Sequence, residues 1–153
     1  MNDKKILFVE DNRLLLSLAI RYFTTLNHKW EIDTANSGDE ALEILENKEY
    51  YYDVIISDYS MPGMTGLDLL KSLRKQGIQI NFIIFTGTTG IIEQEIKDTL
   101  KGLTNTQYVQ KGFLGMQTLY NTLQLMFQQK KLKTSQRRTR INSYLKHFRK
   151  MIV

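Results

Sequence analysis

The 153-residue chain contains no cysteine, so it can form neither a disulfide framework nor a thiolate metal site, and nothing indicates an oxidising compartment. It has only two histidines, His28 and His147, and neither has a partner at the spacing of a metal or catalytic site. No apolar run approaches the roughly 20 residues of a membrane span, and the polar start is too short for a signal peptide. These absences predict a cytoplasmic protein. The length of 153 residues predicts one domain of ordinary size with at most a short appendage.

The positive charge of the chain is concentrated at one end. Residues 1–129 carry 12 Lys and Arg against 16 Asp and Glu, whereas residues 130–153 carry 9 Lys and Arg and no acid. We therefore expect a mildly acidic domain over residues 1–129, followed by a basic C-terminal extension over residues 130–153. Apolar residues at helical spacing predict a basic amphipathic helix in this extension from about Gln136. They are Ile141, Tyr144, Leu145, Phe148 and Ile152.

Three roles remain open for the basic extension. Its apolar stripe could dock on the preceding domain or on a second copy of the chain. Its charge could instead bind an acidic partner, nucleic acid or an anionic membrane surface, or the segment could be a solvated helix. It is too short for a DNA-binding output domain of several helices. The chain is then either a stand-alone domain with an extension or one that stops at the start of a linker.

Five short apolar stretches predict strands, and an amphipathic stretch that predicts a helix follows each of them. The predicted strands are Ile6–Val9, Trp30–Ala35, Val54–Ile56, Ile80–Phe85 and Gln107–Val109. The predicted helices run from Asn12 to about Leu26, from Ser37 to about Glu49, from Thr65 to near Gly77, from Ile91 to Leu100 and from Met116 to Gln129. Asn12 is a suitable helix cap, and Ser37–Glu40 and Thr65–Asp68 read as capping boxes. The alternation predicts an α/β fold with a doubly wound parallel sheet.

Polar residues stand where four of the predicted strands end. Glu10 and Asp11 follow the first strand, Asp58 the third, Thr86 the fourth and Lys111 the fifth. In a flavodoxin-like sheet with strand order 2-1-3-4-5, these four strand ends lie side by side. The sequence therefore predicts that three carboxylates, one hydroxyl and one ammonium share a pocket at the carboxyl edge of the sheet.

The charges of this predicted pocket indicate its chemistry. Three clustered carboxylates repel one another, and one hard divalent cation together with Lys111 would neutralise them. Magnesium suits oxygen ligands and commonly bridges carboxylates to a phosphate. The turn over residues 10–13 is acidic rather than glycine-rich, so it would repel the pyrophosphate of a dinucleotide.

In this order and on these elements, the residues resemble the receiver domain of bacterial two-component response regulators, over about residues 3–128. The motifs that carry the resemblance are Glu10-Asp11, Asp58 with Met61-Pro62-Gly63 and Gly66, Thr86-Gly87, and Lys111. The resemblance implies that Asp58 is the phosphoacceptor. It also implies that Glu10, Asp11, Asp58 and the backbone carbonyl of Ser60 hold Mg²⁺.

The resemblance further assigns a switch. Thr86 and Lys111 would contact the phosphoryl group, and Tyr108, at the family's aromatic switch position, would turn inward when Thr86 moves. Ser60 and Thr88 stand at the two positions that tune dephosphorylation in this family. Gly112 stands where the family usually has a proline with a cis bond, and glycine loosens that loop.

The implied function is that of a signalling phosphoprotein rather than an enzyme that turns over a separate substrate. A sensor histidine kinase or a histidine phosphotransfer protein would donate the phosphoryl group, with Mg²⁺-dependent self-phosphorylation and autodephosphorylation on Asp58. The output would be a downstream protein partner or self-association.

Two alternatives remain for the function. One is a phosphorylation-independent pseudo-receiver that acts as a scaffold through its last helices and its basic extension. The other is a hydrolytic magnesium phosphatase on a similar fold. A phosphatase would need a general acid near Asp58, which the neighbouring Tyr59 and Ser60 do not offer.

Overall fold

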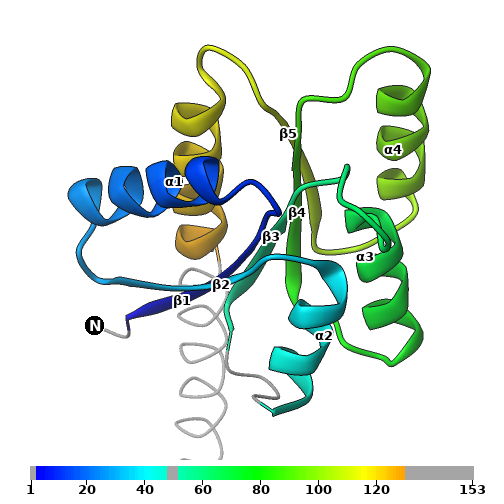
Figure 1. Ribbon diagram of the computed structural model, residues 1–153, viewed down its shortest axis with the longest axis horizontal. Coiled ribbons are helices and arrows are strands. Elements are labelled where there is room, and N and C mark those ends of the chain that lie inside the picture. The colour runs from blue at the N-terminus through cyan, green and yellow to red at the C-terminus, as the bar shows by residue number, and fades with distance from the viewer. Residues whose placement is uncertain (1–2, 48–51, 130–153) are drawn as a thin grey trace, which may run out of the picture. The chain divides into compact units, whose positions relative to one another are not determined.

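A computed structural model describes residues 3–47 and 52–129 of the chain (Figure 1). The chain divides into two compact units, residues 1–116 and 117–153, and the first unit contains the whole sheet with helices α1 to α4. The predicted basic extension over residues 130–153 lies outside the described residues, as does the predicted helix end near Glu49. No helix in the described ranges has the length and apolar character needed to cross a membrane.

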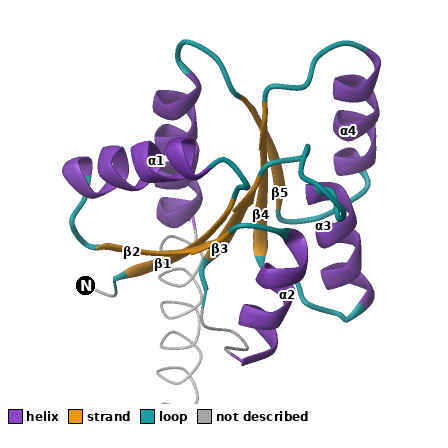
Figure 2. Cartoon of the chain, viewed as in Figure 1, coloured by secondary structure: helices purple, strands orange, loops and turns teal. Residues whose placement is uncertain are grey.

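Five parallel strands form one sheet in the order β2-β1-β3-β4-β5, as the sequence predicted (Figure 2). The strands are β1 (Lys4–Val9), β2 (Trp30–Ala35), β3 (Val54–Ser57), β4 (Asn81–Thr86) and β5 (Thr106–Gln110). The register sets Val9, the last residue of β1, beside Ala35 of β2 and Ser57 of β3. Because these three strands end level with one another, the residues that follow them start from the same edge of the sheet.

The helices cover both faces of the sheet. Within the first unit they are α1 (Arg13–Leu26), α2 (Gly38–Asn47), α3 (Gly66–Lys75) and α4 (Ile91–Lys101). In the second unit, residues 117–129 are also helical. Helix α1 lies on one face, and α2, α3 and α4 lie on the other (Figure 1). Because both faces of the sheet are covered, strand residues that point to either face are buried. This accounts for the uninterrupted apolar run of β3.

Alternate residues of β1 serve the two sides of the core. Leu7 and Val9 belong to the hydrophobic cluster that α2, α3 and α4 complete. Phe8 points to the opposite side, where its ring lies 6.5 Å from that of Phe23 in α1 and 6.3 Å from that of Phe85 in β4. The two-residue period of a strand thus fixes which face each side chain serves.

The predicted helix caps hold the loops that leave the strand ends. The Asn12 side chain accepts hydrogen bonds from two N–H groups in the first turn of α1, and Thr65 and Asp68 form a reciprocal capping box on α3. At α2, the Ser37 hydroxyl accepts from the N–H of Glu40 at 3.1 Å. The Glu40 carboxylate bonds instead to the N–H of the residue before Ser37 at 2.6 Å, so this box is shifted by one residue.

Candidate functional site

Three carboxylates meet at the carboxyl ends of β1 and β3. One oxygen from each of Glu10, Asp11 and Asp58 lies within 4.8 Å of the others. The N–H of Asp58 donates to the carbonyl of Val9 at 2.9 Å, so the strand pairing itself brings the acids together. Glu10 and Asp58 are 1% and 6% exposed, whereas Asp11 is exposed. The cluster therefore has two buried members and one that faces solvent.

Lys111 is shared between the two buried carboxylates. Its Nζ lies 2.7 Å from Oε2 of Glu10 and 3.0 Å from Oδ2 of Asp58. The backbone N–H of Lys111 donates to the carbonyl of Thr86 at 2.8 Å, which fixes the lysine at the end of β5. One cation against three carboxylates leaves a net negative charge, and this charge favours a further cation in the site.

One carboxylate oxygen of Asp58 could accept a ligand. Oδ1 of Asp58 is buried and has no hydrogen-bond partner among the described residues. An unpartnered buried carboxylate oxygen is costly unless a ligand takes it up. An all-oxygen cluster with one solvent-facing member suits Mg²⁺, which keeps several waters when it binds carboxylates. Ser60, the fourth predicted ligand, is exposed two residues after Asp58, and the role of its carbonyl stays a prediction.

The start of α3 packs directly on the backbone of Asp58. A Cβ at Gly66 would lie 2.1 Å from the carbonyl oxygen of Asp58, so only glycine fits this position. The N–H of Gly66 donates to the carbonyl of Tyr59 at 3.0 Å, and the buried Ser57 hydroxyl donates to the carbonyl of Asp58 at 2.8 Å. Sequence reasoning missed Ser57, although a serine that ends a buried apolar strand was a signal for it.

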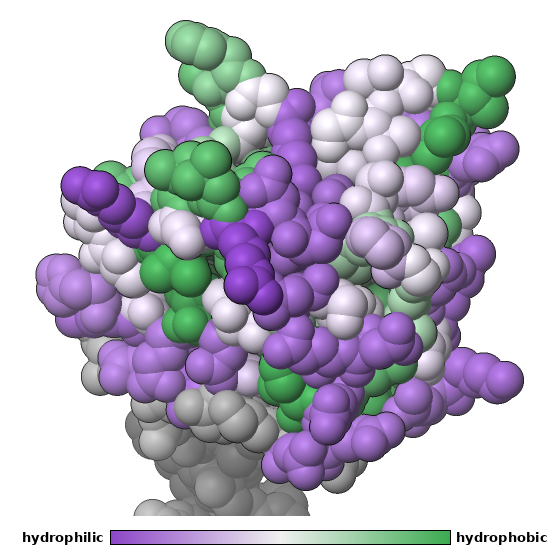
Figure 3. All heavy atoms as spheres, in the orientation of Figure 1, coloured by the Kyte–Doolittle hydropathy of each residue, from purple (hydrophilic) through white to green (hydrophobic). Residues whose placement is uncertain are grey.

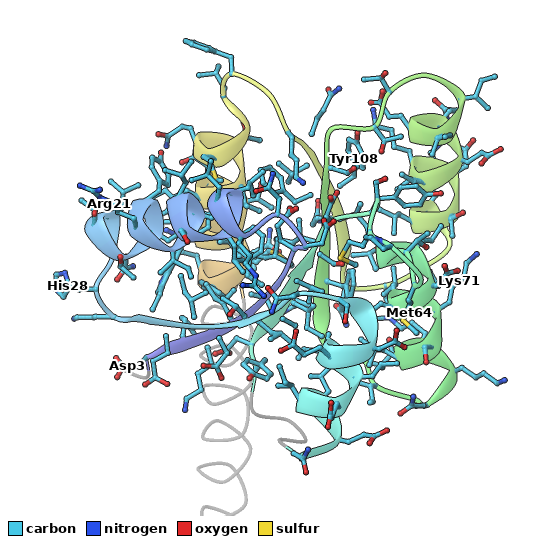
Figure 4. The ribbon with its side chains drawn as sticks, in the orientation of Figure 1. Asp3, Arg21, His28, Met64, Lys71 and Tyr108 are labelled. Atoms are coloured by element: carbon cyan, nitrogen blue, oxygen red, sulfur yellow. The ribbon has the colours of Figure 1, made fainter. Side chains whose placement is uncertain are left out.

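Thr88 joins the two residues that the sequence assigned to a switch. The hydroxyl of buried Thr86 lies 3.0 Å from that of Thr88, and the hydroxyl of Tyr108 donates to the Thr88 carbonyl at 3.4 Å. Tyr108 belongs to β5, and its side chain lies on the side of α4 (Figure 4). Burial raises the pKa of Tyr108, and the negative charge of Glu93 acts in the same direction. Sequence reasoning gave no sign of this link through Thr88.

The acidic cluster gives stability a pH dependence that can be measured. Burial raises the pKa of Glu10 above 4.5, with Asp58 adding to the rise and Lys111 opposing it. Between 4.5 and the raised pKa, the folded protein binds more protons than the unfolded chain. The Glu10 contribution to stability is therefore fully present at low pH and is lost as the pH rises through this window.

Glu10→Gln, which imitates the protonated carboxyl, should not lose this stability. In urea unfolding with a metal chelator present, we expect the variant and the wild type to be similar below pH 4.5. The variant should become progressively more stable than the wild type as the pH rises above that value. A difference that did not change with pH would contradict the assignment of the raised pKa to Glu10.

The fold and site define a class of protein, and comparison with known families identifies it. The family model of the response regulator receiver domain matches residues 6–124, and the chain belongs to this family. Among curated proteins, it is similar to the response regulator SaeR of Staphylococcus aureus, with 30% identity over 128 residues. The match covers 82% of this chain and 52% of SaeR, so the chain spans about half the length of that relative.

Solved structures of receiver domains have the same fold. The Vibrio cholerae chemotaxis protein CheY4 aligns with a TM-score of 0.63 and 32% identity, over 80% of this chain and 98% of that one. A receiver domain protein from Clostridium thermocellum aligns at 0.68 with 29% identity, over 84% and 98%. The Thermotoga maritima response regulator TrrA, solved in complex with Mg²⁺-BeF, aligns at 0.66 with 27% identity, over 80% and 98%. The family and flavodoxin-like fold predicted from the sequence are thus confirmed.

Proposed function

We propose that this chain accepts a phosphoryl group on Asp58 and transmits the resulting change in conformation. The observation that carries the proposal is the unpartnered, buried Oδ1 of Asp58 inside a carboxylate cluster that faces Lys111. This arrangement offers a nucleophilic oxygen, a cation for the incoming phosphoryl oxygens and a set of oxygen ligands for a metal ion. Phosphoryl transfer needs positioning and charge stabilisation more than any other contribution from the protein.

In the proposed reaction, a carboxylate oxygen of Asp58 attacks the phosphorus of a phosphohistidine on a sensor kinase or a phosphotransfer protein. An O–P bond forms, the P–N bond breaks, and the imidazole leaves with the bonding electron pair. Lys111, already 3.0 Å from Asp58, would pair with one of the arriving phosphoryl oxygens. The product acyl phosphate carries about one more negative charge than the free carboxylate.

Glu10, Asp11 and Asp58, with the predicted carbonyl of Ser60, would hold the magnesium ion. When bound, Mg²⁺ supplies positive charge that offsets the negative charge of the phosphoryl oxygens. The complex of the relative TrrA with Mg²⁺-BeF supports this assignment for the present chain. The ligand chemistry also fits, because all three side chains offer carboxylate oxygens.

The added charge would act on the segment that follows β4. A phosphoryl group on Asp58 offers the Thr86 hydroxyl a stronger acceptor than its present partner, the Thr88 hydroxyl at 3.0 Å. If Thr86 turns toward the phosphoryl group, Thr88 loses that contact, and its carbonyl is the one that accepts from Tyr108. The proposed switch therefore runs from Asp58 through Thr86 and Thr88 to Tyr108.

The surface of α1 favours a protein as the phosphoryl donor over a small phosphodonor. Apolar side chains interrupt the hydrophilic surface over α1 (Figure 3). Leu14 and Leu18 of this helix, which begins two residues after the acidic pair, are 71% and 56% exposed. Exposed leucines one turn apart, on the helix that follows Glu10 and Asp11, favour a partner protein that presents its phosphohistidine to the cluster.

Intact mass measurement tests the proposal. We expect the protein to gain the mass of one phosphoryl group when it is incubated with acetyl phosphate and Mg²⁺, and to gain much less when a chelator replaces Mg²⁺. No gain under either condition, with the protein folded, would contradict the proposal and favour the pseudo-receiver. Sustained hydrolysis of a phosphate monoester would favour the phosphatase instead.

A further inference from the structure

We propose that Lys97 and Glu93 of α4 are positioning residues that hold Tyr108 where it lies in this structure and oppose its movement. The second part of this proposal, the opposition to switching, rests on the proposed function. The first part concerns only the side chains around one aromatic ring.

The face of the Tyr108 ring is covered by a cation. Nζ of Lys97 lies 4.8 Å from the ring centroid, within the range of a cation–π interaction. The same Nζ lies 2.5 Å from Oε1 of Glu93, one helical turn earlier on α4. The lysine side chain is 43% exposed and the glutamate side chain 20%. The ion pair with Glu93 favours the side-chain position in which the Lys97 ammonium lies over the ring.

The hydroxyl of Tyr108 is held as well. It donates to the Thr88 carbonyl at 3.4 Å. Glu93 acts on the ring through the ammonium with which it pairs. Contacts from α4 and from the segment before it restrain Tyr108 at two points, at the ring face and at the hydroxyl.

This arrangement has an energetic consequence for the switch. If Tyr108 turns, it leaves the Lys97 ammonium and the Thr88 carbonyl together. These contacts stabilise the unphosphorylated arrangement alone, so they should shift the two-state equilibrium toward it. A phosphoryl group that forms a hydrogen bond with Thr86 would favour the movement of Tyr108, and the Lys97 contact would oppose it. Side chains of α4 would thus help to determine the equilibrium between the two positions of Tyr108.

A second ion pair on the same helix provides a matched control. Nζ of Lys101 lies 2.7 Å from Oδ1 of Asp98, and both side chains are more than half exposed. Within the described parts of the chain, this ammonium does not lie over an aromatic ring. Lys101→Met thus removes the same kind of charge and the same kind of ion pair from α4 without touching Tyr108.

Fluorine NMR of protein that carries 3-fluorotyrosine tests the first part of the proposal. Tyr108→Phe identifies the Tyr108 signal by its loss. Without any phosphoryl mimic, Lys97→Met should displace or broaden this signal, whereas Lys97→Arg, which keeps a cation over the ring, and Lys101→Met should leave it near its wild-type position. If Lys97→Met and Lys101→Met gave the same Tyr108 signal, the proposal would be overturned.

Titration with beryllofluoride and Mg²⁺ tests the second part, with the Tyr108 signal as readout. We expect Lys97→Met to lower the beryllofluoride concentration for half-conversion by about two- to fivefold, which corresponds to one cation–π contact at a partly exposed site. Lys97→Arg and Lys101→Met should match the wild type. An unchanged or raised midpoint in Lys97→Met would overturn the second part. A wild-type protein with no response at all would instead count against the proposed function, and the signals without ligand would still decide the first part.

Discussion

Asp58→Asn is expected to abolish phosphoryl uptake from acetyl phosphate and leave the fold intact. The amide has nearly the shape of the carboxylate, so the backbone contacts of this residue with Val9 and Ser57 can persist. The amide lacks the charged oxygen that attacks phosphorus, and it offers a poorer ligand to a divalent cation. Intact mass measurement after incubation with acetyl phosphate and Mg²⁺ should show the unmodified variant only.

Asp58→Asn should also change the pH dependence of stability. Asp58 is one of the groups that raise the pKa of Glu10, so removing its charge should bring that pKa nearer to 4.5. The pH window over which Glu10 loses its stabilising contribution should therefore narrow in the variant. Urea unfolding at several pH values, in the presence of a chelator, measures this second effect independently of phosphorylation.

Asp68→Asn is the matched control for the Asp58 variant. Asp68 lies in the segment after the same strand, but it is exposed and its carboxylate caps α3 through Thr65. We expect this control to take up the phosphoryl group as the wild type does. If Asp58→Asn gained the same mass as the control, the phosphoacceptor would be a different residue and the proposed mechanism would be wrong.

The fold could be predicted because its determinants are local. Period-two burial and β-branched runs mark the strands, and caps such as Asn12 mark the helix starts. The second strand, Trp30–Ala35, has the bounds that its alternation predicted. Strands β3 and β4 extend one residue past their predicted ends, to Ser57 and Thr86, because parallel pairing continues after the apolar run stops.

The candidate site could be predicted only in part. The order of the strands is enough to bring Glu10, Asp58 and Lys111 to one edge of the sheet, and the structure places them in contact there. The order of strands does not determine side-chain directions. The contact of Lys97 with the Tyr108 ring depends on how α4 lies against β5, and no periodic pattern connects those two positions.

The close approach of Gly66 to Asp58 could not be predicted for a related reason. A glycine that opens a helix has several explanations from sequence alone, and the capping box at Thr65 and Asp68 already explains a helix start there. The distance of 2.1 Å from a Cβ at Gly66 to the Asp58 carbonyl is a property of how the loop folds back. Such contacts between loop and strand are found only in three dimensions.

Lys111→Met is expected to slow phosphoryl uptake by about 10²-fold or more, the range found when one preorganised charge-stabilising donor is removed. Lys111 contacts both Glu10 and Asp58. Methionine has nearly the length of the lysine side chain but carries no charge. The rate of mass gain with acetyl phosphate and Mg²⁺ measures the effect. Lys111→Arg, which keeps the charge, should retain more activity than Lys111→Met.

Stability should respond to Lys111→Met as well. Breaking a buried ion pair costs about 3–5 kcal/mol, an upper limit here because Glu10 can take up a proton instead. We therefore expect a loss of stability at neutral pH that is smaller in acid and smaller when Mg²⁺ is present. Adding Glu10→Gln should restore part of this stability, because it removes the carboxylate that was left without its cation, but it should not restore phosphoryl uptake.

Lys4→Met separates the role of Lys111 from the loss of any paired lysine. Lys4 also pairs with a carboxylate, with its Nζ 3.5 Å from Asp53, and its side chain is 26% exposed against 19% for Lys111. It stands at the amino end of β1, at the opposite edge of the sheet from the cluster. Phosphoryl uptake should be unchanged in Lys4→Met. Equal rates in Lys111→Met and Lys4→Met would show that the cation beside Asp58 does not stabilise the transferring phosphoryl group.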